Sequence, residues 1–527
     1  MQRVSGSGAS PGSSGGSSGS GGISGSGGKI GSGGTSGSGG INGSGGVNGT
    51  SSGGASGSGS GGARGTGGTS ATGSLTVSGL TIAANPRMSL ACYVSWTTDQ
   101  AANSEVQFGL GGYQLHIVDP AQVTDHKVYV LGMHAQTAYR IKAVSTNPTA
   151  TGSVEGTFTT GALPQGIPAA ATLLTDVPNK SQRGWTLANI QAGATAQGST
   201  QRPALIVIVD ESAQPVWYYV HGTAADTRGD VATTWLSAEK HVLVGAATGT
   251  SPAEVDLEGN VIWTGPAQPT GRGADPMTHH TGKLSNGDYI VTHEASGGAV
   301  VQELSPQNAV VWSWSLFDHI TPPQDANDWC HPNAATIDEV GDFLYLNCRF
   351  QGLFKANRSG SGDVIWQMGA GIDSLTTGDF TYLPTNDVRI NDTHDPEVHD
   401  DGTILFYDNQ GYAARTQGQM NGSLHSRVVE YQVDQTNKQA TLTWEFPGTF
   451  AVDSWYTQSW YTQIWGDADR QPNGNVLITA GNRGAGTETR IFEVTRAGEV
   501  VWAMAWPTNN GSYRADRISP ALAADLP

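Results

Sequence analysis

The sequence predicts an all-β chain, in which a six-bladed β-propeller follows a small β-sandwich and a disordered Gly/Ser-rich N-terminal tether. Three observations support this prediction. Residues 1–73 are almost entirely small residues and contain no aromatic side chain. Short strand-like runs between Asn, Pro, Gly and Asp turns then fill residues 74–162. From residue 184 onward, a strand pattern that ends in a Trp recurs six times.

The first stretch, residues 1–73, has too few apolar side chains to offset the entropy of ordering the backbone. We therefore expect a flexible tether. The start, MQRVSGSG, lacks the apolar region of a signal peptide, and the chain has no apolar run long enough to span a bilayer. A Gly/Ser tether before a β-rich chain is typical of surface-held proteins. We expect a periplasmic, secreted or cell-surface anchored protein whose export signal is not visible here.

Residues 74–162 form the predicted sandwich, and residues 163–183 the predicted linker. Trp96 on an early strand and Tyr139 in TAYRIKA resemble the core Trp and corner Tyr of a fibronectin type III module. Such modules are mostly spacers or docking surfaces. The strand-like runs are SLTVSGLTI, CYVSWTT, SEVQFGL, KVYVLGM, AYRIKAVS and GTFTTG.

Residues 184–527 form the predicted propeller. Each unit contains a hairpin with an Asn-Gly or Asp-Gly type of turn, which supplies the positive φ that tight hairpins need, and a later strand that ends in Trp. An open array of β-sandwiches is the alternative. We expect GWTLANI, residues 184–190, to close the ring against the last blade. The recurring tryptophans are Trp217, Trp263, Trp312, Trp366, Trp444 and Trp502.

Histidines recur where the innermost strands of these units begin. They are His279 and His280 in the third unit, His331 in the fourth and His394 in the fifth. Equivalent positions on neighbouring blades converge on the axis, so these side chains should meet in one mouth of the channel. The hairpin 328–349 adds Asn333 and Arg349. A transition-metal site is the rival interpretation, but an Arg in the cluster repels a cation.

The charge and the cysteines restrict the partners. A net charge of -18 argues against nucleic acid or an anionic membrane as the main partner. The three cysteines, Cys92, Cys330 and Cys348, have no zinc spacing. Because Cys330 and Cys348 flank the hairpin, they can oppose each other across it. A disulfide and two buried free thiols both stay open.

The fourth to sixth units resemble the bacterial arylsulfate sulfotransferase family. The matching stretches are THHTGKLSNGDYIVTH, DWCHPNAATI, LNCRFQGLFKANRSGSGDVIWQMG, THDPEVHDDGTILFYDNQ and DADRQPNGNVLITAGN. Three departures, HHT for HHD, Cys330 in a variable position and THD for QH, indicate a divergent branch. The resemblance covers roughly residues 180–505 and implies a propeller enzyme that needs no nucleotide, cofactor or metal.

The resemblance also implies the roles of individual residues. His394 would be the nucleophile that carries the sulfo group, and Arg349 would bind sulfonyl oxygens through its planar fork. Asn333 would donate an N–H to the same group, and His331 and His280 would donate protons or hydrogen bonds. His279 is the alternative to His280, because period 2 lets only one of the two face the axis.

Other residues near the predicted mouth carry weaker expectations. His399 should be solvated in its turn, and Tyr407, Asp408 and Asn409 should close a turn. Arg415 and Arg483 are candidates to reach the mouth. Four tryptophans either form an aryl-binding wall or pack normally, namely Trp329, Trp455, Trp460 and Trp465.

The function predicted from these features is transfer of a sulfo group from a phenolic sulfate to a phenol through sulfohistidine. Three alternatives stay open: an aryl sulfate hydrolase by the same route, a non-catalytic propeller that binds an anionic or glycan ligand, and a metal-dependent lyase or hydrolase. The physiological donor and acceptor are not predicted, and a homodimer is one oligomeric state that the sequence allows.

Overall fold

The computed structural model describes residues 74–192, 203–222, 231–246, 250–267, 277–295, 298–321, 329–369, 378–384, 390–411, 425–481 and 487–518. The predicted tether, residues 1–73, lies outside these ranges. Residues 70–527 form one compact unit. Its described part is almost wholly strand, with a 3₁₀ turn η1 (Leu316–Asp318) and a π turn η2 (Trp455–Ser459). None of its helices has the length and apolarity needed to cross a membrane.

The first sheet covers the predicted sandwich. Two of the predicted strands form one long strand, β2, because pairing continues past a register shift after Thr97. Its first half pairs with β1 and its second half with β4. Trp96 and Tyr139 lie in its core, and the Tyr139 hydroxyl accepts the His134 N–H at 2.9 Å. The likeness to a fibronectin type III module stays a prediction. The strands are β1 (Val77–Ala84), β2 (Cys92–Gly109), β3 (Leu115–Val130), β4 (Ala138–Thr146) and β5 (Thr151–Thr159).

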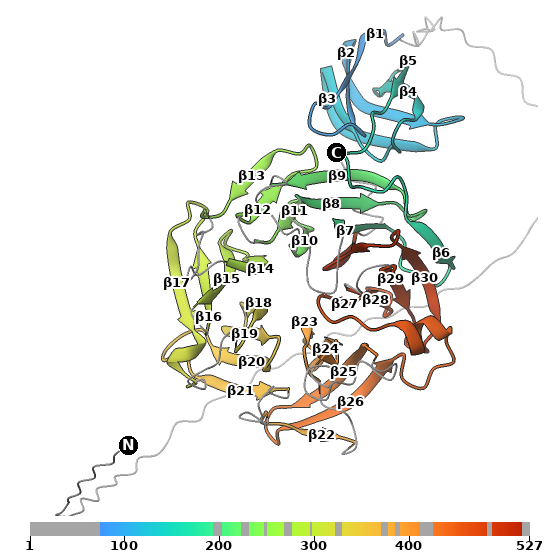
Figure 1. Cartoon of the computed structure of the whole chain (residues 1–527). Helices are drawn as coiled ribbons and strands as arrows, with labels where there is room; N and C mark the ends of the chain where they lie inside the picture. The colour runs from blue at the N-terminus through green and yellow to red at the C-terminus, as the bar shows by residue number, and fades with distance from the viewer. Residues whose placement is uncertain are drawn as a thin grey trace, which may run out of the picture. The chain divides into compact units, whose positions relative to one another are not determined.

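Six further sheets occur in the described residues, antiparallel except where β22 pairs with β26 in parallel in the fifth, and Figure 1 shows them side by side around a ring. The first holds β7 (Trp185–Ala192), β8 (Ala204–Val209), β9 (Pro215–His221), β31 (Asn510–Gly511) and β32 (Ala515–Ile518). The second holds β10 (Thr233–Leu236), β11 (His241–Val244), β12 (Ala253–Val255) and β13 (Val261–Thr264). The third holds β14 (Met277–Lys283), β15 (Tyr289–Ala295), β16 (Gly298–Leu304) and β17 (Val310–Ser315).

The last three sheets continue the ring. The fourth holds β18 (Pro332–Asp338), β19 (Phe343–Cys348), β20 (Gly352–Asn357) and β21 (Val364–Met368). The fifth holds β22 (Thr381–Leu383), β23 (His394–Val398), β24 (Thr403–Asp408), β25 (Arg427–Asp434) and β26 (Gln439–Phe446). The sixth holds β27 (Asp467–Arg470), β28 (Val476–Thr479), β29 (Arg490–Val494), β30 (Val500–Ala505) and β6 (Thr172–Asp176).

The recurring tryptophans join each sheet to the next. Their indole N–H groups donate to the following sheet in turn, and the last donates back to the first. The acceptors are Leu257 O for Trp217, Asn308 Oδ1 for Trp263, Arg358 O for Trp312, Gln435 Oε1 for Trp366, Arg496 O for Trp444 and Glu211 O for Trp502. A closed propeller requires each sheet to contact the next and the last sheet to contact the first, and these hydrogen bonds provide such contacts. Six blades in the whole chain stays a prediction.

The ring closes differently from the prediction for residues 184–190. That stretch forms β7, which belongs to the first sheet and pairs with β32 and β31 from the end of the chain. The last strands therefore close the ring, because they supply the inner edge that β7 needs. The predicted linker also contributes to the ring, since β6 pairs with β30 of the sixth sheet.

Candidate active site

Three neighbouring inner strands begin with the same irregularity. The register shifts between Thr278 and Thr281 in β14, between Pro332 and Ala334 in β18, and between His394 and Glu397 in β23. At or directly before each shift a residue other than Gly has a positive φ: His279 (35°) and Asp395 (41°) lie within the shifts, and His331 (52°) directly precedes β18. Bulges of this kind redirect side chains and are frequent beside active sites. Because β14 contacts β18 and β18 contacts β23, the three shifts lie next to one another.

The imidazole rings of His279, His331 and His394 gather around Tyr513. The ring centroid of His279 lies 5.5 Å from that of His331 and 5.2 Å from that of Tyr513. The Tyr513 ring lies 5.9 Å from His394 and meets it edge-on. Tyr513 is fully buried in the segment between β31 and β32. Sequence reasoning missed this residue, because its position depends on how the chain end closes the ring.

His280, which was predicted to deliver a proton, is held away from this group. Its Nδ1 accepts a hydrogen bond from Arg514 Nη1 at 2.8 Å. Burial and the Arg514 charge lower the pKa of His280 to about 3, so its ring is neutral near pH 7. The structure therefore favours His279 as the histidine that faces the site. The bulge in β14 explains the choice, because it turns His279 toward His331.

The surroundings of His394 determine which of its ring nitrogens carries the proton. Nδ1 lies 2.7 Å from Asn409 Oδ1. The Asn409 amide nitrogen donates to Thr462 O at 3.0 Å and to Trp465 O at 2.8 Å, so the amide oxygen must face the imidazole. Because the Asn409 oxygen can only accept a hydrogen bond, His394 Nδ1 must carry the proton that it donates. The Nε2 lone pair then accepts the Trp465 backbone N–H at 3.2 Å.

The backbone at residues 465 and 466 is shaped for this contact. Trp465 has φ 63°, which is unusual for a bulky residue, and Gly466 has φ 128°. A Cβ on Gly466 would lie 2.2 Å from the Tyr407 ring. Only Gly fits at position 466. The backbone conformation there directs the Trp465 N–H toward Nε2 of His394.

The pKa of the His394 imidazole is well below its ordinary value of 6.5. Burial is the largest cause, the Arg349 charge is the second, and the hydrogen bond to Asn409 opposes both. The ring is therefore neutral at physiological pH. A buried neutral imidazole with a proton on Nδ1 presents Nε2 as its nucleophilic atom.

Arg349 supplies a buried positive charge near His394. Its Nη2 donates to Gln463 O at 2.8 Å, and its Nε lies 4.0 Å from Asp392 Oδ1. The guanidinium carbon lies 4.9 Å from the centroid of the Phe350 ring. Only 9% of Arg349 is exposed. The planar fork is thus oriented by a carbonyl, a carboxylate and an aromatic face before any substrate arrives.

A comparison with models of protein families matches Arylsulfotransferase (ASST) over residues 174–514. The chain belongs to this family. It is an arylsulfotransferase, an enzyme that acts on small aryl substrates. The matched residues include every histidine of the site, Arg349 and Tyr513. No curated protein matches the chain.

Solved structures with a similar course of the chain are distant from this arylsulfotransferase. A protein of unknown function from Bacteroides caccae has 11% identity and a TM-score of 0.40, with 63% of this chain and 99% of that chain covered. Sqt1 from Chaetomium thermophilum has 10% identity and a TM-score of 0.31, with 75% and 92% covered.

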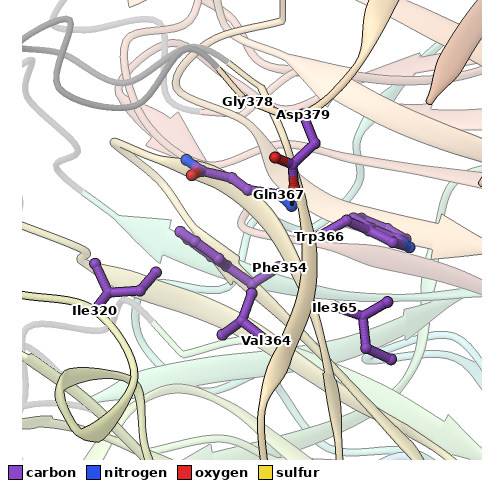
Figure 2. Close-up of a pocket in the computed structure, with 8 residues that line it drawn as sticks. All are labelled: Ile320, Phe354, Val364, Ile365, Trp366, Gln367, Gly378 and Asp379. Carbon is purple, nitrogen blue, oxygen red and sulfur yellow. Dashed lines mark hydrogen bonds between the residues drawn. The ribbon is translucent and has the colours of Figure 1, made fainter. Parts of the chain in front are cut away.

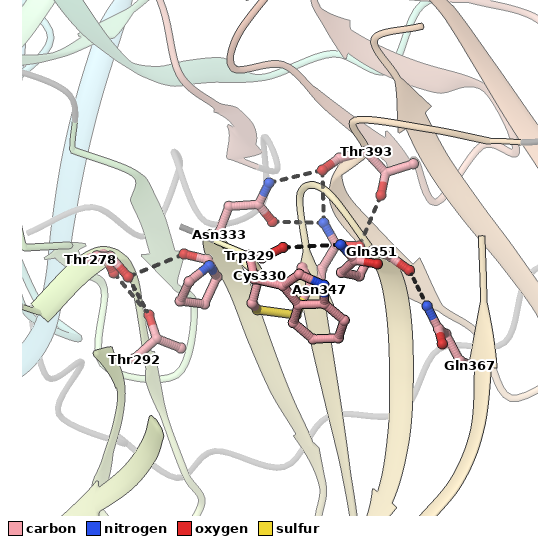
Figure 3. The surroundings of a disulfide bond; sticks show 11 residues. Thr278, Thr292, Trp329, Cys330, Asn333, Asn347, Gln351, Gln367 and Thr393 are labelled. Atoms are coloured by element: carbon pink, nitrogen blue, oxygen red, sulfur yellow. Dashed lines mark hydrogen bonds between the residues drawn. A yellow bond between two sulfur atoms is a disulfide. The ribbon is translucent and has the colours of Figure 1, made fainter. Parts of the chain in front are cut away.

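Asn333 of the arylsulfotransferase lies in a buried amide network rather than beside His331. Its Nδ2 donates to Thr393 O at 2.8 Å, and its Oδ1 accepts from Asn347 Nδ2 at 2.7 Å. Asn347 also donates to Thr393 O, and the Thr393 hydroxyl donates back to Asn347 Oδ1. Figure 3 shows this network joining β18 and β19 to the residue before His394. The contacts indicate that Asn333 fixes the start of β23.

A disulfide joins Cys330 to Cys348, which answers the question that the sequence left open. Cys330 precedes His331 and Cys348 precedes Arg349, so the bond ties two site residues together at the open end of the hairpin. Figure 3 shows it beneath the amide network, next to Trp329. Cys92 is a buried free thiol.

The remaining candidates divide between site and core. Asn409 was expected to close a turn but instead orients His394. The Tyr407 hydroxyl and the Asn409 amide both contact the Thr462 hydroxyl, and Asp408 forms a buried ion pair with Arg427. Trp465 lies at the site, whereas Trp329, Trp455 and Trp460 pack in hydrophobic clusters. His399 is half-buried rather than solvated. Arg415 and Arg483 lie outside the described residues.

A cavity of about 390 Å³ lies at the outer edge of the fourth sheet and contains none of the predicted site residues. Figure 2 shows its apolar wall of Ile320, Phe354 and Val364 opposite Gln367 and Asp379. The Asp379 carboxylate accepts the Gln367 backbone N–H at 2.8 Å. This cavity offers no nucleophile. Within the described residues, no group of three or more His, Cys, Asp or Glu is arranged to hold a metal ion.

Proposed function

We propose that this arylsulfotransferase moves a sulfo group from a phenolic sulfate to a phenol through a sulfohistidine at His394, without a nucleotide donor. The observation that carries the proposal is the orientation of His394. Asn409 holds the proton on Nδ1, burial keeps the ring neutral, and Nε2 carries the reactive lone pair, which gives up its hydrogen bond from the Trp465 N–H when it attacks sulfur. A covalent intermediate divides the transfer into two easier displacements.

The first displacement forms a bond between Nε2 and sulfur while the ester bond between sulfur and oxygen breaks. The electron pair of the broken bond leaves on the aryl oxygen. Nδ1 keeps its proton, so the product is an Nε2-sulfo imidazolium, and the Asn409 amide oxygen stabilises its ring charge. The aryloxide takes a proton from His279 or His331 in its imidazolium form, which is left as a neutral imidazole.

The second displacement reverses these events with a new phenol. That phenol returns its proton to the same histidine while its oxygen attacks sulfur, and the bond between nitrogen and sulfur breaks with its electrons returning to Nε2. Arg349 binds the sulfonyl oxygens in both steps. Its planar fork presents two parallel N–H groups, a geometry that a lysine lacks. Preoriented charge of this kind usually makes the largest contribution to such catalysis.

The test is turnover of a chromogenic aryl sulfate by the full chain, with and without phenol and without nucleotide. We expect phenol-dependent colour and, after a rapid quench, a peptide containing His394 that is heavier by one sulfo group. His394→Ala should lose turnover about 1,000-fold or more while keeping its melting temperature. His116→Ala is the matched control, because His116 is exposed on β3. Colour that does not depend on phenol would instead indicate a hydrolase.

We also propose that the enzyme works in the periplasm, outside the cell or on its surface. The Cys330–Cys348 disulfide supports this location, because disulfides persist in oxidising compartments. Fractionation of the native cells tests it: activity that stays with the cytosolic fraction, with both thiols reduced, would contradict the proposal.

A further inference from the structure

Four of the six seams between neighbouring sheets of the ring hold a buried ion pair; at the seam after the first sheet, the residue opposite Trp217 is the apolar Ile208. In each sheet, the recurring Trp stands opposite one residue of the adjacent strand. That residue is Glu254 opposite Trp263, Glu303 opposite Trp312, Glu430 opposite Trp444 and Glu493 opposite Trp502. All four carboxylates are at most 3% exposed. Each pairs with a cation of the next sheet in the ring: Lys283, Arg358, Arg470 and Arg517, respectively.

The seam between the fourth and fifth sheets breaks this rule at both positions. The residue opposite Trp366 is Lys355, so the charge is reversed. The cation at the end of the next inner strand is also replaced. Lys283 and Arg470 end β14 and β27 immediately before the hairpin turn, and the equivalent residue of β23 is Val398. Lys355 therefore faces an apolar side chain where the other seams place the opposite charge.

Lys355 forms no ion pair with a carboxylate among the described residues, although the charge of Asp338 acts on it from nearby. Its ammonium donates to Gln435 Oε1 at 3.2 Å and lies 3.7 Å from the centroid of the Phe343 ring. Lys355 is 6% exposed, and burial lowers the pKa of its ammonium. A buried ammonium that is not directly paired with a carboxylate is costly, and a bound anion would reduce that cost.

A cavity of about 400 Å³ occupies the place of the missing partner. Lys355, Tyr345 and Trp366 line it from the fourth sheet, and Val398 and His399 line it from the fifth. His399 Nε2 has no hydrogen-bond partner among the described residues, although Glu397 Oε2 lies 3.4 Å away. The cavity is at the far end of β23 from His394, roughly 16 Å along the strand. It is separate from the histidine site.

Two carboxylates also line the cavity, and neither forms an ion pair with Lys355, although the Asp338 charge opposes the effect of burial on the pKa of the ammonium. Asp338 uses its Oδ1 to accept the backbone N–H groups of Val340 and Gly341 in the hairpin turn. Asp400 is exposed in the turn after β23. The carboxylates of Asp338 and Asp400 can accept hydrogen bonds from hydroxyl or amide groups of a ligand whose anionic end lies at Lys355.

We propose that this seam is a binding site for a small ligand that carries a carboxylate or sulfate group. The oxyanion of the ligand pairs with Lys355 and accepts an N–H from His399, and the body of the ligand lies beside Tyr345 and Trp366. The ligand thus supplies the counter-charge that a neighbouring sheet supplies at four other seams.

The experiment is calorimetric titration of the full chain with sodium sulfate and with benzoate, and with benzamide as the neutral control. We expect the wild type to bind at least one of the two anions and not benzamide. Lys355→Met should weaken this binding at least tenfold and leave aryl sulfate turnover unchanged. Arg349→Ala should leave the same binding unchanged. Sulfate alone would identify a compact inorganic anion, and tighter benzoate binding would identify an aromatic carboxylate.

A second variant keeps the test decisive if Lys355→Met does not fold. The double substitution K355E with V398R rebuilds the ion pair of the other seams, so we expect it to fold, to melt at a higher temperature and to lose anion binding. The proposal is wrong if the wild type binds neither anion, if binding survives in K355E/V398R, or if Arg349→Ala removes it. The last result would place the anion at the histidine site.

Discussion

Replacement of Asn409 should lower both the stability of the fold and the rate of the reaction, and the two effects can be measured separately. Asn409 is fully buried and joins the His394 imidazole to two carbonyl oxygens, those of Thr462 and Trp465. In Asn409→Leu the Trp465 carbonyl loses its described donor, and Nδ1 keeps only Asp392 O at 3.2 Å. A buried polar group left unmet costs about 1–3 kcal/mol, so we expect a loss of about 2–4 kcal/mol in the free energy of unfolding.

The same variant should be slower, because nothing then fixes the ring or keeps the proton on Nδ1. Loss of a residue that orients a functional histidine typically costs about 10–100-fold in activity, which is about 1.4–2.7 kcal/mol of activation free energy. We expect this loss in kcat, with KM little changed. Urea unfolding and steady-state kinetics on one preparation measure both quantities.

A control and a second substitution make this prediction specific. Asn475 is a buried amide of the sixth sheet that donates to Lys180 O at 2.8 Å and Glu493 Oε1 at 2.6 Å. Asn475→Leu should lose similar stability without a change in kcat. Asn409→Asp keeps an acceptor for Nδ1 but adds a negative charge, which raises the pKa of His394 and makes kcat/KM rise with pH. An unchanged kcat in Asn409→Leu, or a flat pH profile in Asn409→Asp, would refute the assigned tautomer.

Three further outcomes follow from the same site. Arg349→Lys should lower kcat at least about tenfold at unchanged melting temperature, because an ammonium cannot bind two sulfonyl oxygens in one plane; near-normal kinetics would rule out that role. Replacing Cys330 and Cys348 by Ala opens a loop with a sequence separation of 18 residues, so the free energy of unfolding should fall by about 3 kcal/mol, with activity falling too. His394 and His280 are neutral in the fold and bind protons once unfolded, so stability should fall as pH falls below about 6.5, and urea midpoints at pH 7 and pH 5 would show it.

The periodic features of the sequence predicted the fold well, because they arise from local chemistry. Turns such as SNGD and PNGN need the positive φ of Gly287 and Gly474, and both have it. The recurring Trp marks one strand of every sheet. How the ring closes was not predictable in this way. The stretch at 184–190 is a strand whichever sheet it joins, and its partner β32 lies more than 300 residues later in the chain.

The site was predictable as a set of residue types and not as a geometry. Repeat positions identified His331, His394 and Arg349, but alternation along a regular strand could not choose between His279 and His280. That choice depends on the bulge in β14, where a residue with positive φ changes which side chain faces the axis. Sequence patterns assume regular pairing, and function here depends on three departures from it. The strands thus provide the ring, and the bulges, with the chain end and Asn409, bring three histidines together and orient the imidazole of His394.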